Sequence, residues 1–116
     1  MLFTNRQIRL ATRLKKAGLV WQPGRGQYAF DIGGRIRPGS PFQKGVYYFL
    51  DFPCFVEYFG SVEQLAESMA WLPTFEEALE WKSSQMHRDS LAMHLKNDTE
   101  LDFLYQRRLT ELNRSA

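Results

Sequence analysis

The spacing of hydrophobic positions near the N-terminus is helical. Apolar side chains recur there at intervals of three, four and seven residues, as on the buried face of an amphipathic helix. They are Leu10, Ala11, Leu14 and Ala17. Thr4-Asn5-Arg6-Gln7 has the S/T-x-x-E/Q form of a capping box, in which two side chains satisfy free N–H groups at a helix start. Since Gly18 is a frequent type of C-terminal stop, the pattern predicts a helix between Thr4 and Gly18.

The pattern changes to one typical of strands between residues 19 and 52. Residues 19–22 and 27–30 flank the turn-rich tetrapeptide Pro-Gly-Arg-Gly, which predicts a β-hairpin. Gly33-Gly34 indicates a second turn, and residues 35–37 a short strand. In residues 46–52 every second position is apolar, and aromatic residues also occupy positions between them, so we expect a central strand that Pro53 ends.

The second half of the chain has helical spacing. Residues 55–59 predict a helical turn that Gly60 closes, and capping patterns at residues 61–64 and 74–77 predict two further helices. We expect residues 71–73 to form a buried connector, because Pro73 favours an extended residue before it. From Asp89 onward the spacing is helical again, with a change of register at Asn97-Asp98 that predicts two helices or one bent helix.

These elements predict an α+β fold. It would contain an N-terminal helix, a small antiparallel sheet of three or four strands, and then three or four helices packed on one side. A chain of 116 residues suits one modest core, so we predict a single domain over residues 1–116, with residues 98–116 as a candidate protruding helical tail. The composition, 44% apolar and 24% charged, is typical of a folded protein.

The aromatic stretch of residues 45–60 is either a core or a binding surface. We favour a core, formed by the large apolar residues at inward positions of their elements. The predicted core residues are Trp21, Tyr48, Leu50, Phe52, Phe55, Trp71 and Leu79. Three other aromatic side chains remain for a second face of the sheet, where they are available to stack on a ligand: Tyr47, Phe49 and Tyr58. The single cysteine, Cys54, is expected to be a small buried hydrophobe.

No apolar run approaches the ~20 residues that span a bilayer, because Asp51 and Glu57 interrupt the most hydrophobic stretch. The charged residues at the start precede no apolar signal core. We therefore expect a cytoplasmic protein without a membrane partner.

Three short motifs lack the context that their chemistry needs. Residues 24–29 match a loose dinucleotide-binding pattern, but a strand rather than a helix should follow. Glu80-Trp81-Lys82, with Asp51 upstream, matches an E-x-K nuclease element, which requires a strand where we expect a helix. His87 and His94 are fewer ligands than zinc usually has. We therefore predict no catalytic residue, cofactor or metal site.

The charges are distributed unevenly. Residues 1–45 carry nine basic residues and one acidic residue, whereas residues 46–116 carry six basic and twelve acidic residues. Such asymmetry favours an anionic partner or an internal electrostatic match. The basic residues at helical spacing in the first helix form a stripe, and three arginines follow it in the chain. The candidate anion-binding or nucleic-acid-binding residues are Arg6, Arg9, Arg13, Lys16, Arg25, Arg35 and Arg37.

The last helix carries a stripe of apolar residues that a small sheet would leave uncovered. They are Leu101, Tyr105, Leu109 and Leu112. Because exposed apolar stripes often mark interfaces, we expect this one to bind a protein partner or a second copy of the chain.

The sequence therefore favours a non-enzymatic interaction module, a small intracellular accessory or regulatory protein. The alternative is a nucleic-acid-binding protein that uses the basic N-terminal half, and the least favoured function is a metal-dependent hydrolase. The first two differ in whether the basic groups are free at the surface or are paired with acidic residues of the later helices, namely Glu63, Glu67, Glu76, Glu77 and Glu80.

Overall fold

The computed structural model describes residues 2–36, 39–40, 43–82 and 98–115. These residues confirm the α+β class, with an N-terminal helix, a three-stranded antiparallel sheet and further helices. They belong to two compact units. The terminal unit is formed by Met1–Leu19 and Pro73–Ala116, and the middle unit by Val20–Leu72.

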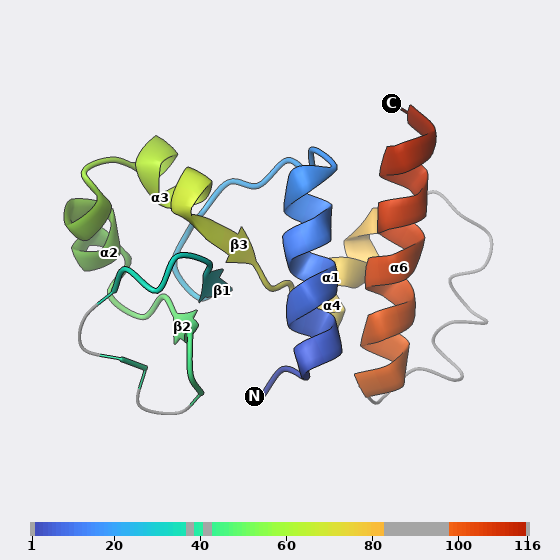
Figure 1. Ribbon diagram of the computed structural model, residues 1–116, viewed down its shortest axis with the longest axis horizontal. Coiled ribbons are helices and arrows are strands. Elements are labelled where there is room, and N and C mark those ends of the chain that lie inside the picture. Colours follow the sequence, from blue (N-terminus) through green and yellow to red (C-terminus); the bar gives the residue numbers. More distant parts are fainter. Residues whose placement is uncertain (1, 37–38, 41–42, 83–97, 116) are drawn as a thin grey trace. The chain divides into compact units, whose positions relative to one another are not determined.

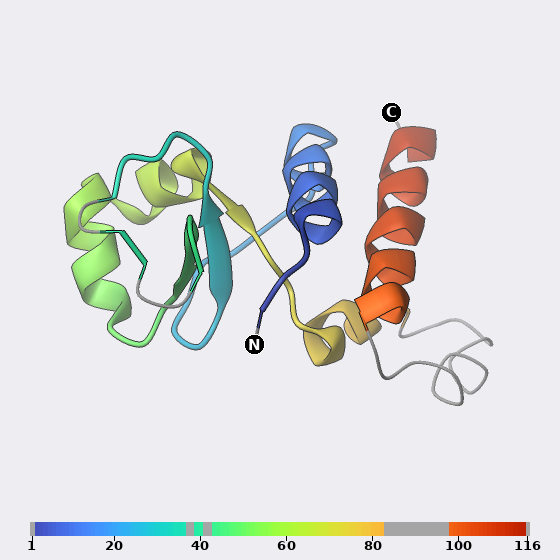
Figure 2. The same ribbon diagram turned by 60° about the horizontal axis from the view of Figure 1, so that its bottom comes forward.

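The terminal unit is helical. Its elements are α1 (Asn5–Lys16), α4 (Phe75–Leu79), the 3-10 helix η1 (Glu80–Lys82) and α6 (Asp98–Ser115). α6 lies alongside α1 (Figure 1) and also packs on α4 (Figure 2). The core of the unit consists of fully or almost fully buried side chains of α1 and α6: Leu10, Ala11, Leu14, Leu101, Leu104, Tyr105 and Leu109.

α1 begins with the capping box that the sequence predicts. The Thr4 hydroxyl accepts a hydrogen bond from the Gln7 N–H, and the Gln7 side-chain oxygen accepts one from the Thr4 N–H, both at 3.0 Å. Two N–H groups that a helix start leaves free are thereby satisfied. The third predicted box, at Thr74 and Glu77, forms in the same way and starts α4.

The predicted apolar stripe of α6 lies inside the terminal unit. Leu101, Tyr105 and Leu109 are buried, and Leu112 is partly buried. The Tyr105 hydroxyl donates a hydrogen bond to the Pro73 carbonyl at 2.6 Å. The expectation of an uncovered stripe on a protruding tail is therefore corrected. α1 and α4 supply the apolar surface that packs against α6 within the terminal unit.

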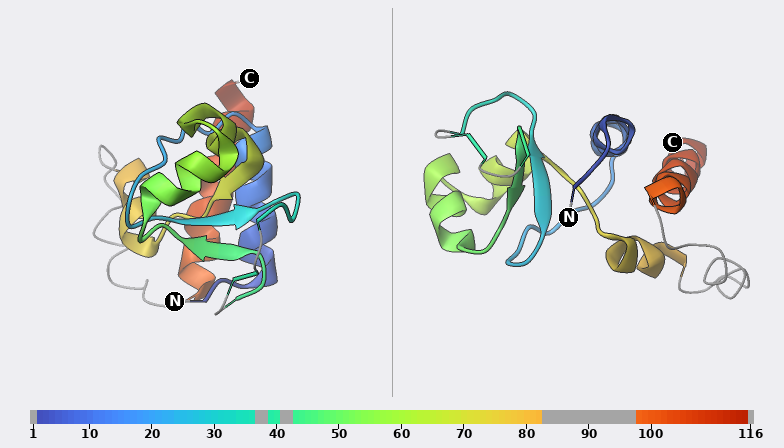
Figure 3. Two further views of the ribbon diagram at one scale, coloured as in Figure 1. Left: turned by 90° about the vertical axis from the view of Figure 1, so that its left-hand side faces the viewer. Right: turned by 90° about the horizontal axis from the view of Figure 1, so that it is seen from below.

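The middle unit is a sheet covered on one face by two helices. The strands β1 (Tyr28–Asp31), β2 (Val46–Tyr48) and β3 (Met69–Trp71) are antiparallel in the order β2-β1-β3. The helices α2 (Phe52–Phe59) and α3 (Val62–Ser68) lie on one face (Figure 3). Its core is formed by Ala29, Ile36, Tyr47, Phe49, Phe59, Leu65 and Met69.

The pairing of the strands differs from the sequence prediction. Residues 19–22 form no strand, so there is no hairpin across residues 23–26. A single side chain organises that segment instead, because the Gln27 amide oxygen accepts hydrogen bonds from Trp21 Nε1 at 2.8 Å and from Gly24 N at 3.0 Å. β1 is the central strand and β2 an edge strand, whereas residues 69–71, expected to lie in a helix and a connector, form the third strand.

Two residues in and just after β2 that were predicted to be in the core are exposed instead. Tyr48 and Leu50 are 40% and 65% exposed, whereas Tyr47 and Phe49 are buried. The other predicted core residues, Trp21, Phe52, Phe55, Trp71 and Leu79, are partly buried. Side chains alternate between the faces of a strand, so Tyr47 and Phe49 face the core under the two helices. Tyr48 faces the other side of the sheet, where Val46 is nonetheless buried. Because aromatic residues occupy both sets of positions, the sequence alone does not show which set is buried.

Pro53 lies in the first turn of a helix. The Asp51 side chain accepts a hydrogen bond from the Cys54 N–H at 3.4 Å, and Pro53 lies in the first turn of α2, where proline is well tolerated. The helix ends at Gly60, whose φ of +101° is in the left-handed region. Cys54 is exposed on this first turn, so its predicted burial is corrected.

Candidate nucleic-acid interface

The basic stripe of α1 is an exposed surface. Arg6, Arg9, Arg13 and Lys16 all have exposed side chains. Their spacing of three, four and three residues places them on one side of the helix, while Leu10 and Leu14 face the core. The capping box and the apolar contacts with α6 hold the helix that carries the stripe. The four cations are therefore presented on a fixed backbone.

Most of the stripe is not neutralised by the acidic residues nearby. Arg6 Nε lies 3.7 Å from Asp102 Oδ2 on α6, and the two side chains are 63% and 15% exposed. Within the described ranges, Arg9, Arg13 and Lys16 form no ion pair. No described ion pair joins the stripe to the glutamates of α4.

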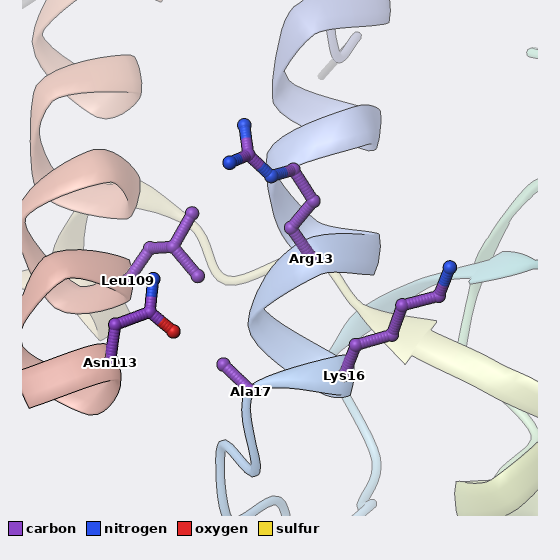
Figure 4. A pocket seen from close by; sticks show the side chains of 5 residues that line it. All are labelled: Arg13, Lys16, Ala17, Leu109 and Asn113. Carbon is purple, nitrogen blue, oxygen red and sulfur yellow. The ribbon is translucent and has the colours of Figure 1, made fainter. Parts of the chain in front are cut away.

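A shallow pocket of about 290 Å³ lies beside the stripe, between α1 and α6. It is lined by Arg13, Lys16, Ala17, Leu109 and Asn113. Arg13 reaches toward α6, whereas the Lys16 side chain extends away from it (Figure 4). Leu109 is buried and supplies an apolar wall. A guanidinium and a primary amide are hydrogen-bond donors, so this α1–α6 pocket suits an anionic group with several acceptor oxygens.

The position of the stripe on the helix also has a structural consequence. Arg13, Lys15 and Lys16 are in the last turn of α1, where the partial negative charge of the helix end favours cations by about 0.3–1 kcal/mol each. These residues therefore stabilise α1. The same helix end contributes no attraction for an anion, so the side chains alone must supply it.

The remaining predicted basic residues belong to the middle unit and differ from one another. Arg25 is exposed and forms no ion pair with any described residue. Arg35 is exposed, but two contacts restrain its side chain. Its Nη1 donates a hydrogen bond to Ser68 Oγ at 3.0 Å, and its guanidinium carbon lies 5.5 Å from the Phe59 ring centre. Tyr58 also donates a hydrogen bond to the Arg35 carbonyl. Arg37 lies outside the described residues.

The other motifs of the sequence acquire structural explanations where they are described. Glu77 is the capping partner of Thr74, and Glu80-Trp81-Lys82 forms η1. Asp51 caps α2. Within the part of the chain that the structure describes, no group of three His, Cys, Asp or Glu side chains could hold a metal ion. His87 and His94 lie outside that part. No helix among the described residues has the length and hydrophobicity to cross a membrane.

Sequence reasoning missed the residues that α6 contributes to this surface. Asp102 pairs with Arg6, and Leu109 and Asn113 line the pocket. Asp102 and Asn113 belong to the acidic half of the chain and have no local signal that connects them with α1. Leu109 was identified in the sequence as part of an apolar stripe, but that stripe was expected to bind another chain rather than α1. A comparison with protein-family models, with curated proteins and with solved structures gave no match.

Proposed function

We propose that the protein is a non-enzymatic interaction module that binds nucleic acid through the basic stripe of α1. The observation that carries this proposal is the exposure of Arg9, Arg13 and Lys16 without an ion pair among the described residues. An internal electrostatic match would instead pair these groups with carboxylates. Among the described residues, only Arg6 of the stripe has such a pair, and its partner is on α6.

Phosphate binding explains both the chemistry and the spacing of the stripe. Residues three and four positions apart on a helix are neighbours, with about 5–6 Å between their Cβ atoms, so the cations form a continuous row along a phosphate backbone. Each phosphate that they neutralise releases condensed counterions, which is the main source of sequence-independent affinity. A binding role of this kind needs no cofactor and no reacting side chain.

The test is the salt dependence of binding to a fluorescently labelled DNA duplex and a single strand, from about 50 to about 200 mM salt. Three phosphate contacts predict a slope of roughly −2 to −3 in a plot of log affinity against log salt. Arg9→Gln and Arg13→Gln should each make this slope shallower by about one. Circular dichroism would check that each variant keeps the helical content of the wild type.

Arg107→Gln is the matched control. It removes the same charge from α6, where Arg107 Nε lies 3.7 Å from Glu111 Oε2, so the slope should stay that of the wild type. Absence of binding at the lower salt would overturn the proposal and leave a protein as the partner of the module. An equal loss of slope in Arg107→Gln and Arg9→Gln would also overturn it, because net charge rather than the stripe would then be responsible.

A further inference from the structure

The second face of the sheet carries an aromatic pair that the prediction of a buried Tyr48 overlooked. Tyr28 of β1 and Tyr48 of β2 are directly opposite each other in the register, and their ring centres are 4.8 Å apart with a tilt of 47°. Tyr47 and Phe49 belong to the core under α2 and α3. Tyr28 and Tyr48 therefore point to the opposite face, where Tyr48 is 40% exposed.

Backbone hydrogen bonds of the sheet fix the two chain segments that carry this pair. The Phe49 N–H donates to the Gln27 carbonyl at 2.8 Å, next to Tyr48 along the chain. On the other side of the central strand, the Leu72 N–H donates to the Tyr28 carbonyl at 2.9 Å. Because both backbones are fixed, the two rings need little ordering when a flat ligand binds.

A cationic residue, Arg25, precedes the glycine that lies beside the exposed ring. The Gly26 N–H donates to the Phe49 carbonyl at 2.8 Å, and a Cβ at Gly26 would lie 3.9 Å from the Tyr48 hydroxyl oxygen. Gly26 therefore lies beside the Tyr48 hydroxyl, and Arg25 precedes it in the chain. The φ of Gly26, +87°, is in the left-handed region that glycine adopts readily. Arg25 is exposed and lacks an ion pair among the described side chains.

We propose that Tyr48, supported by Tyr28 and with Arg25 on the neighbouring turn, is a stacking site for an unpaired nucleobase, so that the nucleic acid bound is single-stranded. This inference rests on the proposed function. An exposed aromatic ring offers a π-face to any base, and a guanidinium on the neighbouring turn can neutralise a phosphate of the bound strand. A base inside a duplex is already stacked and paired, so it cannot use the ring. The charge of Arg25 favours this ligand over an uncharged apolar partner.

The test compares two labelled strands of about 12 nucleotides, oligothymidine and an abasic strand with the same number of phosphates. Wild-type protein should bind oligothymidine more tightly than either the abasic strand or a duplex. Tyr48→Leu should weaken binding of oligothymidine by roughly 5- to 100-fold and leave binding of the abasic strand unchanged. Tyr48→Phe should restore the affinity, because it retains the ring. Arg25→Gln should weaken binding of both strands, because it removes a phosphate contact.

Phe103→Leu is the control for the loss of an exposed ring, since Phe103 is 48% exposed on α6. It should bind both strands as the wild type does. Equal wild-type affinity for oligothymidine and the abasic strand would overturn the inference, as would equal effects of Tyr48→Leu and Phe103→Leu.

The two proposals fail in distinguishable ways. If Tyr48→Leu weakens binding of oligothymidine while Arg9→Gln and Arg13→Gln have no effect, the stacking site stands and the stripe is overturned. If the stripe variants weaken binding of both strands while Tyr48→Leu has no effect, the stacking site is overturned. If the wild-type protein binds no nucleic acid at about 50 mM salt, both are overturned.

Discussion

The terminal and middle units bury their apolar residues in ways that the sequence reveals to different degrees. Of the predicted inward residues at the N-terminal helix, Leu10, Ala11 and Leu14 are buried, and Ala17 at its C-terminal end is partly buried. In β2 the predicted inward residue Tyr48 is exposed, and its neighbour Tyr47 is buried. Both predictions used the same method, namely the period of the hydrophobic positions.

The difference comes from the polar residues. On α1 the outward positions are arginine and lysine, so only one face of the helix can be buried without desolvating charge. Around β2 the aromatic residues occupy both sets of alternating positions, so either face could enter the core. A helical pattern that contains charges therefore specifies a direction, whereas an aromatic run in a strand specifies only that some of it is buried.

Deletion of residues 98–116 should have the largest effect. It would remove α6 from the buried face of α1, and a helix of 12 residues is marginal in water without tertiary contacts. We expect the helical signal in far-UV circular dichroism to fall by more than the loss of α6 alone explains. The NMR chemical shifts of α1 should lose their helical values, with changes at Leu10 and Leu14. Retention of native α1 shifts would show that α6 is the detachable tail that the sequence predicted.

A pair of neighbouring substitutions would test which side chains in and after β2 face the core of the middle unit. Phe49→Ala should lower the free energy of unfolding by about 3–5 kcal/mol, because Phe49 is fully buried. Leu50→Ala should change it by no more than about 0.5 kcal/mol, since Leu50 is 65% exposed. Chemical denaturation measures both values. A larger effect at Leu50 than at Phe49 would reverse the assignment of the two faces.

Tyr105 should make the terminal unit sensitive to alkaline pH. Burial raises the pKa of its phenol well above 10.0, with nearby Glu77 and Asp102 as smaller causes. The folded state thus retains a proton that the unfolded chain loses, so the contribution of Tyr105 to stability should be constant below pH 10 and should fall as the pH rises beyond it. Tyr105→Phe should cost about 1 kcal/mol at neutral pH for the lost hydrogen bond to Pro73.

The measurement for Tyr105 is denaturant unfolding of the wild type and of Tyr105→Phe at several pH values between neutrality and about 11. The two stabilities should converge at the alkaline end. Parallel curves over the whole range would mean that Tyr105 does not contribute to the pH dependence.

The ion pair of Arg6 should have the smallest effect. Arg6 is largely exposed, so water and salt screen its attraction to Asp102, and Arg6→Gln should cost about 1 kcal/mol or less. A double-mutant cycle with Asp102→Asn would isolate the coupling between the two side chains. A coupling well above that value would mean that this pair, and not only the apolar stripe, holds α1 to α6.

Much of the helical structure was predictable from local chemistry. Thr4 and Gln7 predicted the start of α1, Thr74 and Glu77 that of α4, and Gly60 the end of α2, because each signal acts within a few residues. The exposed stripe of the candidate site was predictable for the same reason. The ion pair with Asp102 was not, because it joins residues 96 positions apart in the chain.

The sheet shows where local signals are insufficient. Residues 23–26 have the composition of a hairpin turn, yet Gln27 bonds with Trp21 and Gly24 close that segment as a loop. β1 instead pairs with strands much further along the chain on both of its sides. β3 has only three residues, too few for a period to be recognised.

By itself the sequence determined the α+β class, the helix boundaries with clear caps and the exposure of the α1 stripe, because caps and charged helical faces are local and exclude alternatives. The tertiary structure decided the strand order, the face of β2 that is buried and the partner of α6. These depend on which distant surfaces meet. Short strands and apolar stripes fit several partners almost equally well, so only the contacts of the folded chain select among them.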